Sequence, residues 1–184
     1  MLLTLAVKLS NSMYKFSLIA IFVAVILFSC VNREPESALE DVELINRSNL
    51  NSFLEKIWNE NDLSAIDSFF SDSLTRQVNS VNLASNKNEL TANLQVYFTG
   101  FPDLKIKIDN MASEGQQVYI SWTLTGTNTG VFGELQPTGK KIKISGISRT
   151  DFNEAGKIIH EEVFYNELSL LQQMGHTLNP PILE

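Results

Sequence analysis

The stretch Gln116–Gly146, QQVYISWTLTGTNTGVFGELQPTGKKIKISG, contains two strand patterns joined by a long turn. In its first part the apolar residues stand at every second position, and they are Val118, Ile120, Trp122 and Leu124. This period of two is typical of a strand with one buried face. If the alternation continues, Asn128 also lies on the buried face. A polar side chain aimed into an apolar interior needs a protein partner, a water molecule or a ligand, so Asn128 is the first candidate site residue.

The residues on either side extend this hairpin into an antiparallel meander. Before it, Leu104, Ile106 and Ile108 alternate with lysines, and Glu114-Gly115 supplies the turn. After it, Ile142 and Ile144 alternate with lysines, and Glu154-Ala155-Gly156 turns the chain into a fourth strand that runs from Lys157 to about Asn166. The pattern therefore predicts about four strands, each with one face turned to solvent.

Helical spacing of apolar residues precedes and follows the strands. It predicts a first helix over 45–59, a second over 63–70, a third that Asn86 and Glu89 cap at its start and Gly100 ends, and a short closing helix that ends at Gly175. Residues 71–86 are polar and weakly patterned, which indicates a loop or a short irregular strand. Trp58 could line a pocket, although an aromatic residue at helical spacing is usually core.

Helices followed by a meander and a closing helix indicate an α+β fold. A strongly curved sheet that wraps around helices leaves a concavity, and such concavities often hold ligands. By analogy with such curved sheets we expect an apolar small-molecule pocket, with Trp122, Tyr97 and Phe98 as its walls.

The N-terminus contains the apolar run Phe16–Phe28, preceded by Lys15 and followed by Ser29-Cys30. The run is short for a membrane span and has the form of the apolar region of a signal peptide. Its end, LFSC, resembles the lipobox of bacterial lipoproteins, which implies lipidation of Cys30 and a mature chain exported and anchored to the cell envelope. The alternative is an uncleaved anchor with an incidental cysteine. Translation could begin at Met1 or at Met13.

These patterns divide the 184 residues into a signal peptide (1–29), an acidic tether (30–43), one folded domain (44–176) and a tail (177–184). Cys30 is the only cysteine, so the chain can form no internal disulfide and the domain has no thiol for catalysis or metal binding. Removal of residues 1–29 leaves 12 basic against 21 acidic residues, a formal charge of −9. Such a body repels phosphate backbones, which argues against nucleic acid as a partner.

Six short motifs resemble the SnoaL-like polyketide cyclases, or ester cyclases, in order and spacing. They are Phe101-Pro102-Asp103-Leu104, Trp122-Thr123 with Gly126-Thr127, Gly130 with Phe132, Pro137-Thr138-Gly139-Lys140, Gly156-Lys157-Ile158 and Leu171-Gln172-Gln173-Met174-Gly175. The resemblance covers about residues 50–175. It implies the cone-shaped fold of nuclear transport factor two, and an intramolecular aldol cyclisation of a polyketide ester without metal or organic cofactor.

The resemblance also implies an aspartate as acid/base just before the last helix, and a histidine after the Gly-Thr pair. This chain has Asn166 and Asn128 at those two positions. Both substitutions keep hydrogen-bonding capacity and remove titration. The resemblance therefore supports the fold and the pocket more than it supports catalysis.

The last strand offers a replacement base. If the strand is regular, His160 and Glu162 share a face with Asn166, and a carboxylate beside an imidazole in an apolar pocket is a workable base. The alternative is that a bulge intervenes, or that this part of the strand is solvated and the two residues form an ordinary surface pair.

Two functions follow from these patterns. The first is a cyclase-type enzyme in which His160 or Glu162 is the base and Asn128 and Asn166 position a carbonyl group. The second is a lipid-anchored module that binds an apolar molecule without converting it, or a scaffold. The resemblance also implies that two copies of the chain can form a homodimer through the outer face of the sheet. The lysines at 105, 107, 141 and 143 make that face either solvated or able to pair with an acidic surface of a partner.

Overall fold

The structure is a computed structural model that describes residues 36–179. The residues from Glu40 onward form one compact unit, and the fold and site below are those of that unit. The predicted signal peptide and Cys30 lie outside the described residues, so they remain predictions. Among the helices that the structure describes, none is both long and apolar enough to cross a membrane.

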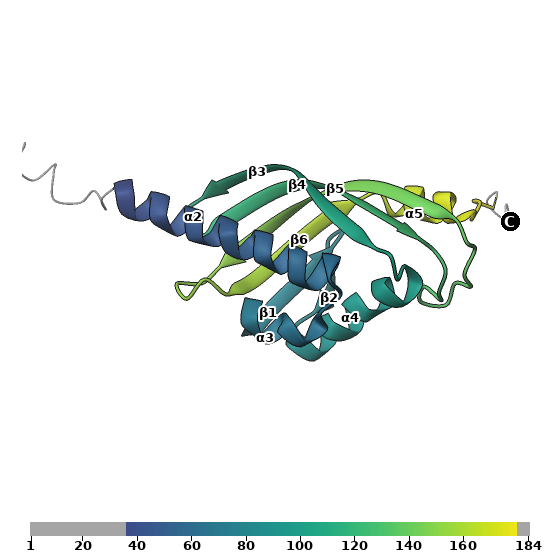
Figure 1. The fold of residues 1–184 in the computed structure, drawn as a ribbon, viewed down its shortest axis with the longest axis horizontal. Coiled ribbons are helices and arrows are strands. Elements are labelled where there is room, and N and C mark those ends of the chain that lie inside the picture. The colour runs from purple at the N-terminus through teal and green to yellow at the C-terminus, as the bar shows by residue number, and fades with distance from the viewer. Residues whose placement is uncertain (1–35, 180–184) are drawn as a thin grey trace, which may run out of the picture. The chain divides into compact units, whose positions relative to one another are not determined.

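The helices occur near the predicted places (Figure 1). They are α2 (Glu36–Phe53), which continues into the π-helical turn η1 (Leu54–Asn59), then η2 (Leu63–Ala65), α3 (Ile66–Phe69), α4 (Lys87–Gly100) and α5 (Glu167–Met174). Asn86 caps α4 by accepting a hydrogen bond from the Glu89 backbone N–H, as predicted. Helix α2 begins at Glu36, so the described part of the predicted tether is helical.

The sheet has six strands in the order β2-β1-β6-β5-β4-β3, and the chain has the expected α+β fold. The strands are β1 (Phe70–Val78), β2 (Val81–Ala84), β3 (Lys105–Glu114), β4 (Gln117–Thr127), β5 (Lys141–Phe152) and β6 (Ile158–Tyr165). All neighbours are antiparallel except β1 and β6, which run parallel. The first and last parts of the domain therefore meet in the middle of the sheet.

The two additional strands come from residues 71–86, where the sequence indicated a loop or irregular strand. A two-residue turn at Asn79 and Ser80, both with positive φ, closes a hairpin between β1 and β2. Leu74, Arg76 and Val78 are all buried and alternate along β1. Because the middle one of the three is an arginine, the sequence does not show the apolar alternation of a strand.

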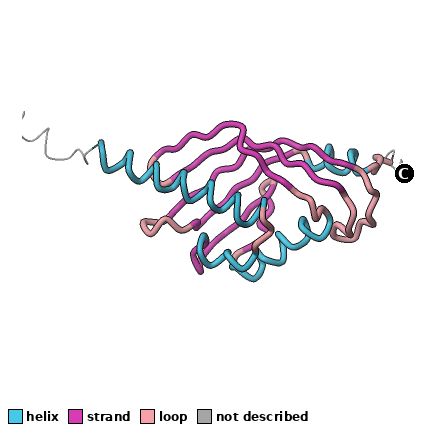
Figure 2. Tube along the Cα trace, in the orientation of Figure 1, coloured by secondary structure: helices cyan, strands magenta, loops and turns pink. Residues whose placement is uncertain are grey.

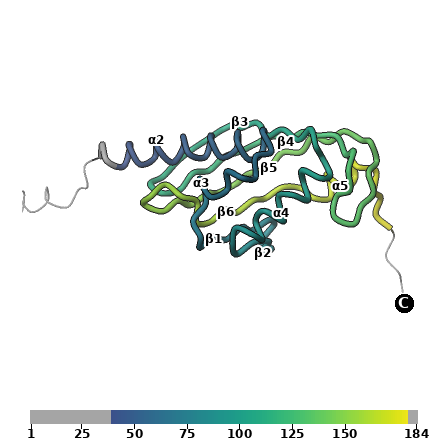
Figure 3. Tube along the Cα trace, turned by 60° about the horizontal axis from the view of Figure 1, so that its bottom comes forward, coloured from purple at the N-terminus to yellow at the C-terminus, as the bar shows by residue number. Residues whose placement is uncertain are grey.

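Helices α2, α3 and α4 lie on one face of the sheet, which we call its inner face, and the long strands arch over them (Figure 2). Strand β4 has the predicted alternation: Val118, Ile120, Trp122 and Leu124 are buried, and so is Asn128 just beyond the strand. Helix α5 lies at one end of the sheet beside the long connection between β4 and β5 (Figure 3). There the Gln173 side chain bonds the backbone N–H and carbonyl of Lys143.

Candidate functional site

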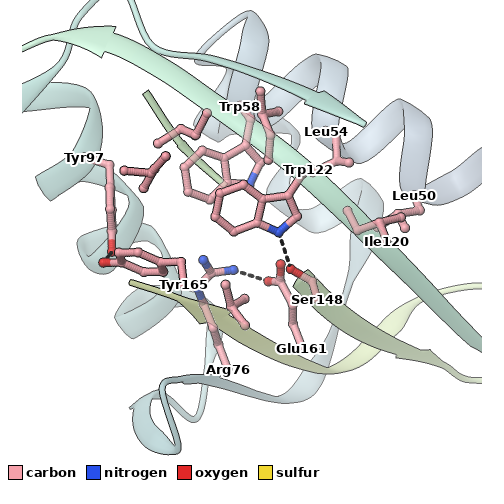
Figure 4. Close-up of a pocket in the computed structure, with 14 residues that line it drawn as sticks. Leu50, Leu54, Trp58, Arg76, Tyr97, Ile120, Trp122, Ser148, Glu161 and Tyr165 are labelled. Carbon is pink, nitrogen blue, oxygen red and sulfur yellow. Dashed lines mark hydrogen bonds and ion pairs between the residues drawn. The ribbon is translucent and has the colours of Figure 1, made fainter. Parts of the chain in front are cut away.

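A cavity lies between the helices and the inner face of β4, β5 and β6 (Figure 4). Its walls are mostly aliphatic and aromatic, with one charged pair and a few polar groups at one side; they include Leu50, Leu54, Trp58, Ile120, Trp122, Leu124, Ile144 and Val163. Its volume is about 30 Å³, which is room for about one water molecule. A larger molecule enters only if wall side chains move.

The charged pair is Arg76 from β1 and Glu161 from β6, and both are almost fully buried. The guanidinium Nη1 donates a hydrogen bond to Glu161 Oε2, and the same guanidinium lies 5.6 Å from the ring centroid of Trp58. Charges in such surroundings are stable only when paired. Arg76 Nε has no hydrogen-bond acceptor, so the guanidinium retains one unused donor.

Two tyrosines flank the pair. The hydroxyls of Tyr97, near the end of α4, and Tyr165, at the end of β6, lie 3.0 Å apart. Burial is the main cause that raises the pKa of the Tyr165 hydroxyl well above its usual range. Tyr165 therefore stays protonated at physiological pH, and since one O–H of the pair is donated to the other oxygen, one proton remains available to a ligand.

Trp122 on β4 forms another part of the cavity wall, and its indole nitrogen points toward Ser148, beside Glu161 (Figure 4). Its indole Nε1 donates a 2.9 Å hydrogen bond to Ser148 Oγ on the neighbouring strand β5. The ring lies over Gly146, where an added Cβ would come within 2.3 Å of it. Because Gly146 has no side chain, the ring can approach the backbone of β5 this closely.

The expectation that His160 and Glu162 face this cavity is wrong, because β6 contains a bulge. Ile158 pairs with Phe152 and His160 pairs with Asp151, so Ile159 is an extra residue that reverses the alternation. Glu161, Val163 and Tyr165 consequently face the cavity.

His160 and Glu162 lie on the opposite face of the sheet. His160 Nδ1 is 2.6 Å from Thr75 Oγ1, and a carboxylate oxygen of Glu162 is 3.6 Å from Arg149 Nη1. This is the bulge and surface-pair alternative that the sequence left open.

Asn166 is exposed and does not line the cavity. Its side chain accepts a 2.9 Å hydrogen bond from the Ser169 backbone N–H and caps α5. The geometry thus gives Asn166 a structural contact and does not bring it to the other predicted site residues.

Asn128 is fully buried but lies away from the cavity, at the base of the connection between β4 and β5. Its Nδ2 donates to the carbonyls of Gly100 and Gly130, and its Oδ1 accepts from the backbone N–H and the hydroxyl of Thr138. The partner that a buried asparagine requires is therefore the protein itself.

Several motifs behind the family resemblance meet around Asn128. Asp103 accepts hydrogen bonds from the backbone N–H and hydroxyl of Thr127, and Gly130 passes so close to α4 that an added Cβ would be 1.9 Å from the Thr99 carbonyl oxygen. These residues tie the end of α4 to the end of β4. They maintain the fold and do not touch the cavity.

Of the predicted walls, Trp122 and Tyr97 line the cavity, whereas Phe98 is a core residue that packs on Trp58. Trp58 itself lines the cavity, although its spacing favoured a core role. The sequence reasoning missed Arg76, Glu161 and Tyr165. Arg76 inside an alternating apolar pattern was the signal that could have revealed the ion pair.

Among residues 36–179, no three His, Cys, Asp or Glu side chains lie close enough to hold a metal ion. The sequence of residues 48–174 matches the family model of the SnoaL-like polyketide cyclases. The chain belongs to the SnoaL-like polyketide cyclase family. A comparison with curated proteins found no match.

Solved structures with this SnoaL-like fold include a protein from Jannaschia sp. CCS1 described as a SnoaL-like polyketide cyclase. It is 20% identical with a TM-score of 0.68, over 82% of this chain and 99% of that one. AclR from Streptomyces galilaeus, described as a hydroxylase, is 22% identical with a TM-score of 0.66, over 76% and 86% of the two chains. IdmH from Streptomyces antibioticus, described as a polyketide cyclase, is 15% identical with a TM-score of 0.62, over 71% and 99%. At these identities the likeness shows the fold alone.

Proposed function

We propose that this chain is a cofactor-free enzyme that removes a proton next to the carbonyl group of a small apolar substrate, with Glu161 as the base. The observation that carries the proposal is a single carboxylate, held by Arg76, on the wall of an otherwise largely apolar cavity. His160 and Glu162 are not part of it, because the bulge at Ile159 turns them to the other face.

The residues suit an aldol-type cyclisation. The Glu161 carboxylate takes the proton, and the electron pair of the broken C–H bond forms an enolate. A tyrosine O–H donates a hydrogen bond to the enolate oxygen. The enolate carbon then attacks a second carbonyl of the same molecule, and the resulting alkoxide takes the proton back from Glu161. Arg76 balances the charge of the carboxylate and fixes its position.

The test compares Glu161→Gln with Glu162→Gln on a series of small β-keto esters. The two variants make the same chemical change at adjacent positions, one in the cavity and one on the outer face. Because a positioned base contributes about 100-fold to 10,000-fold, we expect Glu161→Gln to lower kcat by at least about 100-fold and Glu162→Gln to leave it within about twofold. Equal rates for the two variants, with both proteins folded by circular dichroism, would contradict the proposal.

A second candidate is a binding module that holds an apolar ligand without converting it. Two observations favour it. The Glu161 carboxylate is already paired with Arg76, and the position of the aspartate that the family resemblance implies is occupied by Asn166, which caps α5. Such a module gains thermal stability with its ligand but forms no product. Product formation that depends on Glu161 would exclude it.

A further inference from the structure

Ser148 lies on the wall of the cavity and is almost fully buried. Its Oγ accepts the 2.9 Å hydrogen bond from the indole Nε1 of Trp122. A serine hydroxyl has one hydrogen to donate and two lone pairs, so this bond leaves its hydrogen unused. Among residues 36–179, no group accepts a hydrogen bond from the Ser148 hydroxyl. Trp122 therefore holds the oxygen in place, while the O–H stays available to a molecule in the cavity.

Ser148 also stands beside the carboxylate of Glu161. Strands β5 and β6 are antiparallel, Ser148 pairs with Val163, and Glu161 is two residues before Val163 on the same face. Such diagonal neighbours are about 7–8 Å apart, and both side chains line the same side of the cavity (Figure 4). Tyr165 starts four residues beyond Glu161, a backbone span of about 13 Å. The serine and tyrosine donors thus come from different parts of the wall.

We propose that Ser148 is a catalytic residue that donates a hydrogen bond to the second carbonyl of the substrate, the one that the enolate attacks. This inference rests on the proposed function. In that step the enolate carbon forms the new C–C bond, the π electron pair of the second carbonyl moves to its oxygen, and the resulting alkoxide takes the proton from Glu161. That oxygen must therefore lie within reach of the Glu161 carboxyl group, where the free O–H of Ser148 stands. The serine hydrogen bond stabilises the developing negative charge, and its proton is not transferred.

The other donors of the wall suit this role less well. The two tyrosine hydroxyls are bonded to each other, which leaves one O–H for the enolate oxygen. The guanidinium of Arg76 is engaged with Glu161, and its charge favours an anion at either substrate oxygen without distinguishing them. If Ser148 served only as the partner of Trp122, its loss would disturb the cavity and affect every chemical step alike.

The test follows a diketone in D2O by NMR, because its enolate has two fates. The probe is a linear seven-carbon diketone with a carbonyl at the second carbon from each end, whose aldol cyclisation closes a six-membered ring. The enolate either attacks the second carbonyl and gives the cyclic product, or takes up deuterium and returns as labelled diketone. The ratio of cyclic product to labelled diketone measures the bond-forming step separately from proton abstraction.

We expect Ser148→Ala to lower this ratio by about 100-fold, as the loss of one oxyanion donor does. Deuterium labelling of the seven-carbon methyl ketone, which has no second carbonyl, should stay within about threefold of the wild-type rate. Ser148→Cys keeps a similar volume and has a weak S–H donor, so it should lower the ratio in the same direction even if the alanine variant does not fold.

Thr150→Val is the matched control. It removes an unpaired buried hydroxyl two residues away on the same face of β5, outside the cavity wall, and should leave the ratio and the labelling rate within about twofold. Circular dichroism checks that each variant is folded.

The possible failures are distinguishable. A wild type that labels neither ketone would overturn the proposed function, and the role of Ser148 with it. A wild type that labels the diketone without closing the ring, an unchanged ratio in both Ser148 variants, or an equal fall in Thr150→Val would overturn the role of Ser148 and leave Glu161 as the base. Equal loss of labelling and cyclisation in a folded Ser148→Ala would make Ser148 a support of the cavity instead of a donor to the substrate.

Discussion

At the scale of single residues, Asn128 uses all of its hydrogen-bonding capacity inside the protein. Its Nδ2 donates two hydrogen bonds, one to Gly100 at the end of α4 and one to Gly130, and its Oδ1 accepts two from Thr138, in the same connection as Gly130. An amide has two donor hydrogens and two acceptor lone pairs. Nothing remains to bind a substrate, so the asparagine that first suggested a functional site is a structural connector.

We expect Asn128→Ala to lower the free energy of unfolding by about 2–4 kcal/mol, because buried groups such as the Thr138 N–H lose their partners. Chemical denaturation measures the loss. The exposed neighbour Thr129→Ala should change stability by less than about 0.5 kcal/mol. A similar small change in Asn128→Ala would show that other groups or water replace the asparagine.

Asp103 gives the same connection a dependence on pH. Hydrogen bonds donated by the hydroxyl and backbone N–H of Thr127 hold the pKa of the Asp103 carboxyl below its usual range. A carboxylate with a lowered pKa stabilises the fold above the unfolded-state pKa, about 3.9, and this stabilisation is lost as the pH falls through the folded-state value. Asp103→Asn should therefore be less stable than the wild type at pH 7.

The stability difference between wild type and Asp103→Asn should begin to shrink as the pH falls below about 4, where the Asp103 carboxylate of the unfolded chain takes up a proton, and it should be lost as the pH falls through the lower pKa of the folded state. Denaturation curves of both proteins from pH 7 to pH 2.5 measure it. A difference that stays constant over this range would mean that the hydrogen bonds of ionised Asp103 do not contribute to stability.

At the scale of elements, α5 depends on its N-cap residue, Asn166, which stands just before the helix. Asn166 accepts a hydrogen bond from the Ser169 N–H, and asparagine and aspartate are about equally good caps. We expect Asn166→Ala to destabilise by about 1 kcal/mol and Asn166→Asp to be neutral.

Asn166→Asp also restores the residue type that the family resemblance implies at this position. Because the side chain is exposed and outside the cavity, it should not raise turnover of β-keto esters. A clear gain in kcat would show that the end of β6 reaches the substrate after all.

The sequence allowed the long, regular elements to be predicted and failed where one residue broke a period. The burial of β4 followed from its alternation, and the start of α4 followed from its cap. β1 was missed because a charged residue, Arg76, occupies one of its buried positions and interrupts the apolar pattern. Its partner Glu161 is far away in the sequence, so nothing nearby indicates that the charge is buried. The site was misassigned because a single extra residue, Ile159, exchanges the two faces of β6, and no local pattern marks a bulge.

At the scale of the whole domain, the ion pair joins distant parts of the chain. Arg76 and Glu161 are 85 residues apart. Removing one partner of a buried pair leaves an uncompensated charge, so Arg76→Met or Glu161→Leu alone should cost about 3–5 kcal/mol.

Replacing both residues by apolar ones removes both charges. The double variant Arg76→Met with Glu161→Leu should therefore be much more stable than the sum of the single losses predicts, a coupling that urea denaturation of all four proteins measures. Additive losses would mean that the two groups do not depend on each other. Since the double variant should still fold, its inactivity on β-keto esters would separate the catalytic role of Glu161 from its effect on stability.

The parallel pairing of β1 with β6 also sets the order in which the chain can become native. β1 is made early and its only parallel neighbour is made near the end, so a growing chain holds the guanidinium of Arg76 without its carboxylate until more than eighty further residues have been synthesised. Contacts that close such long loops form late and slowly. The cavity is therefore among the last parts of the domain to be completed, and a chain that stops before Glu161 has neither the ion pair nor the wall on which it stands.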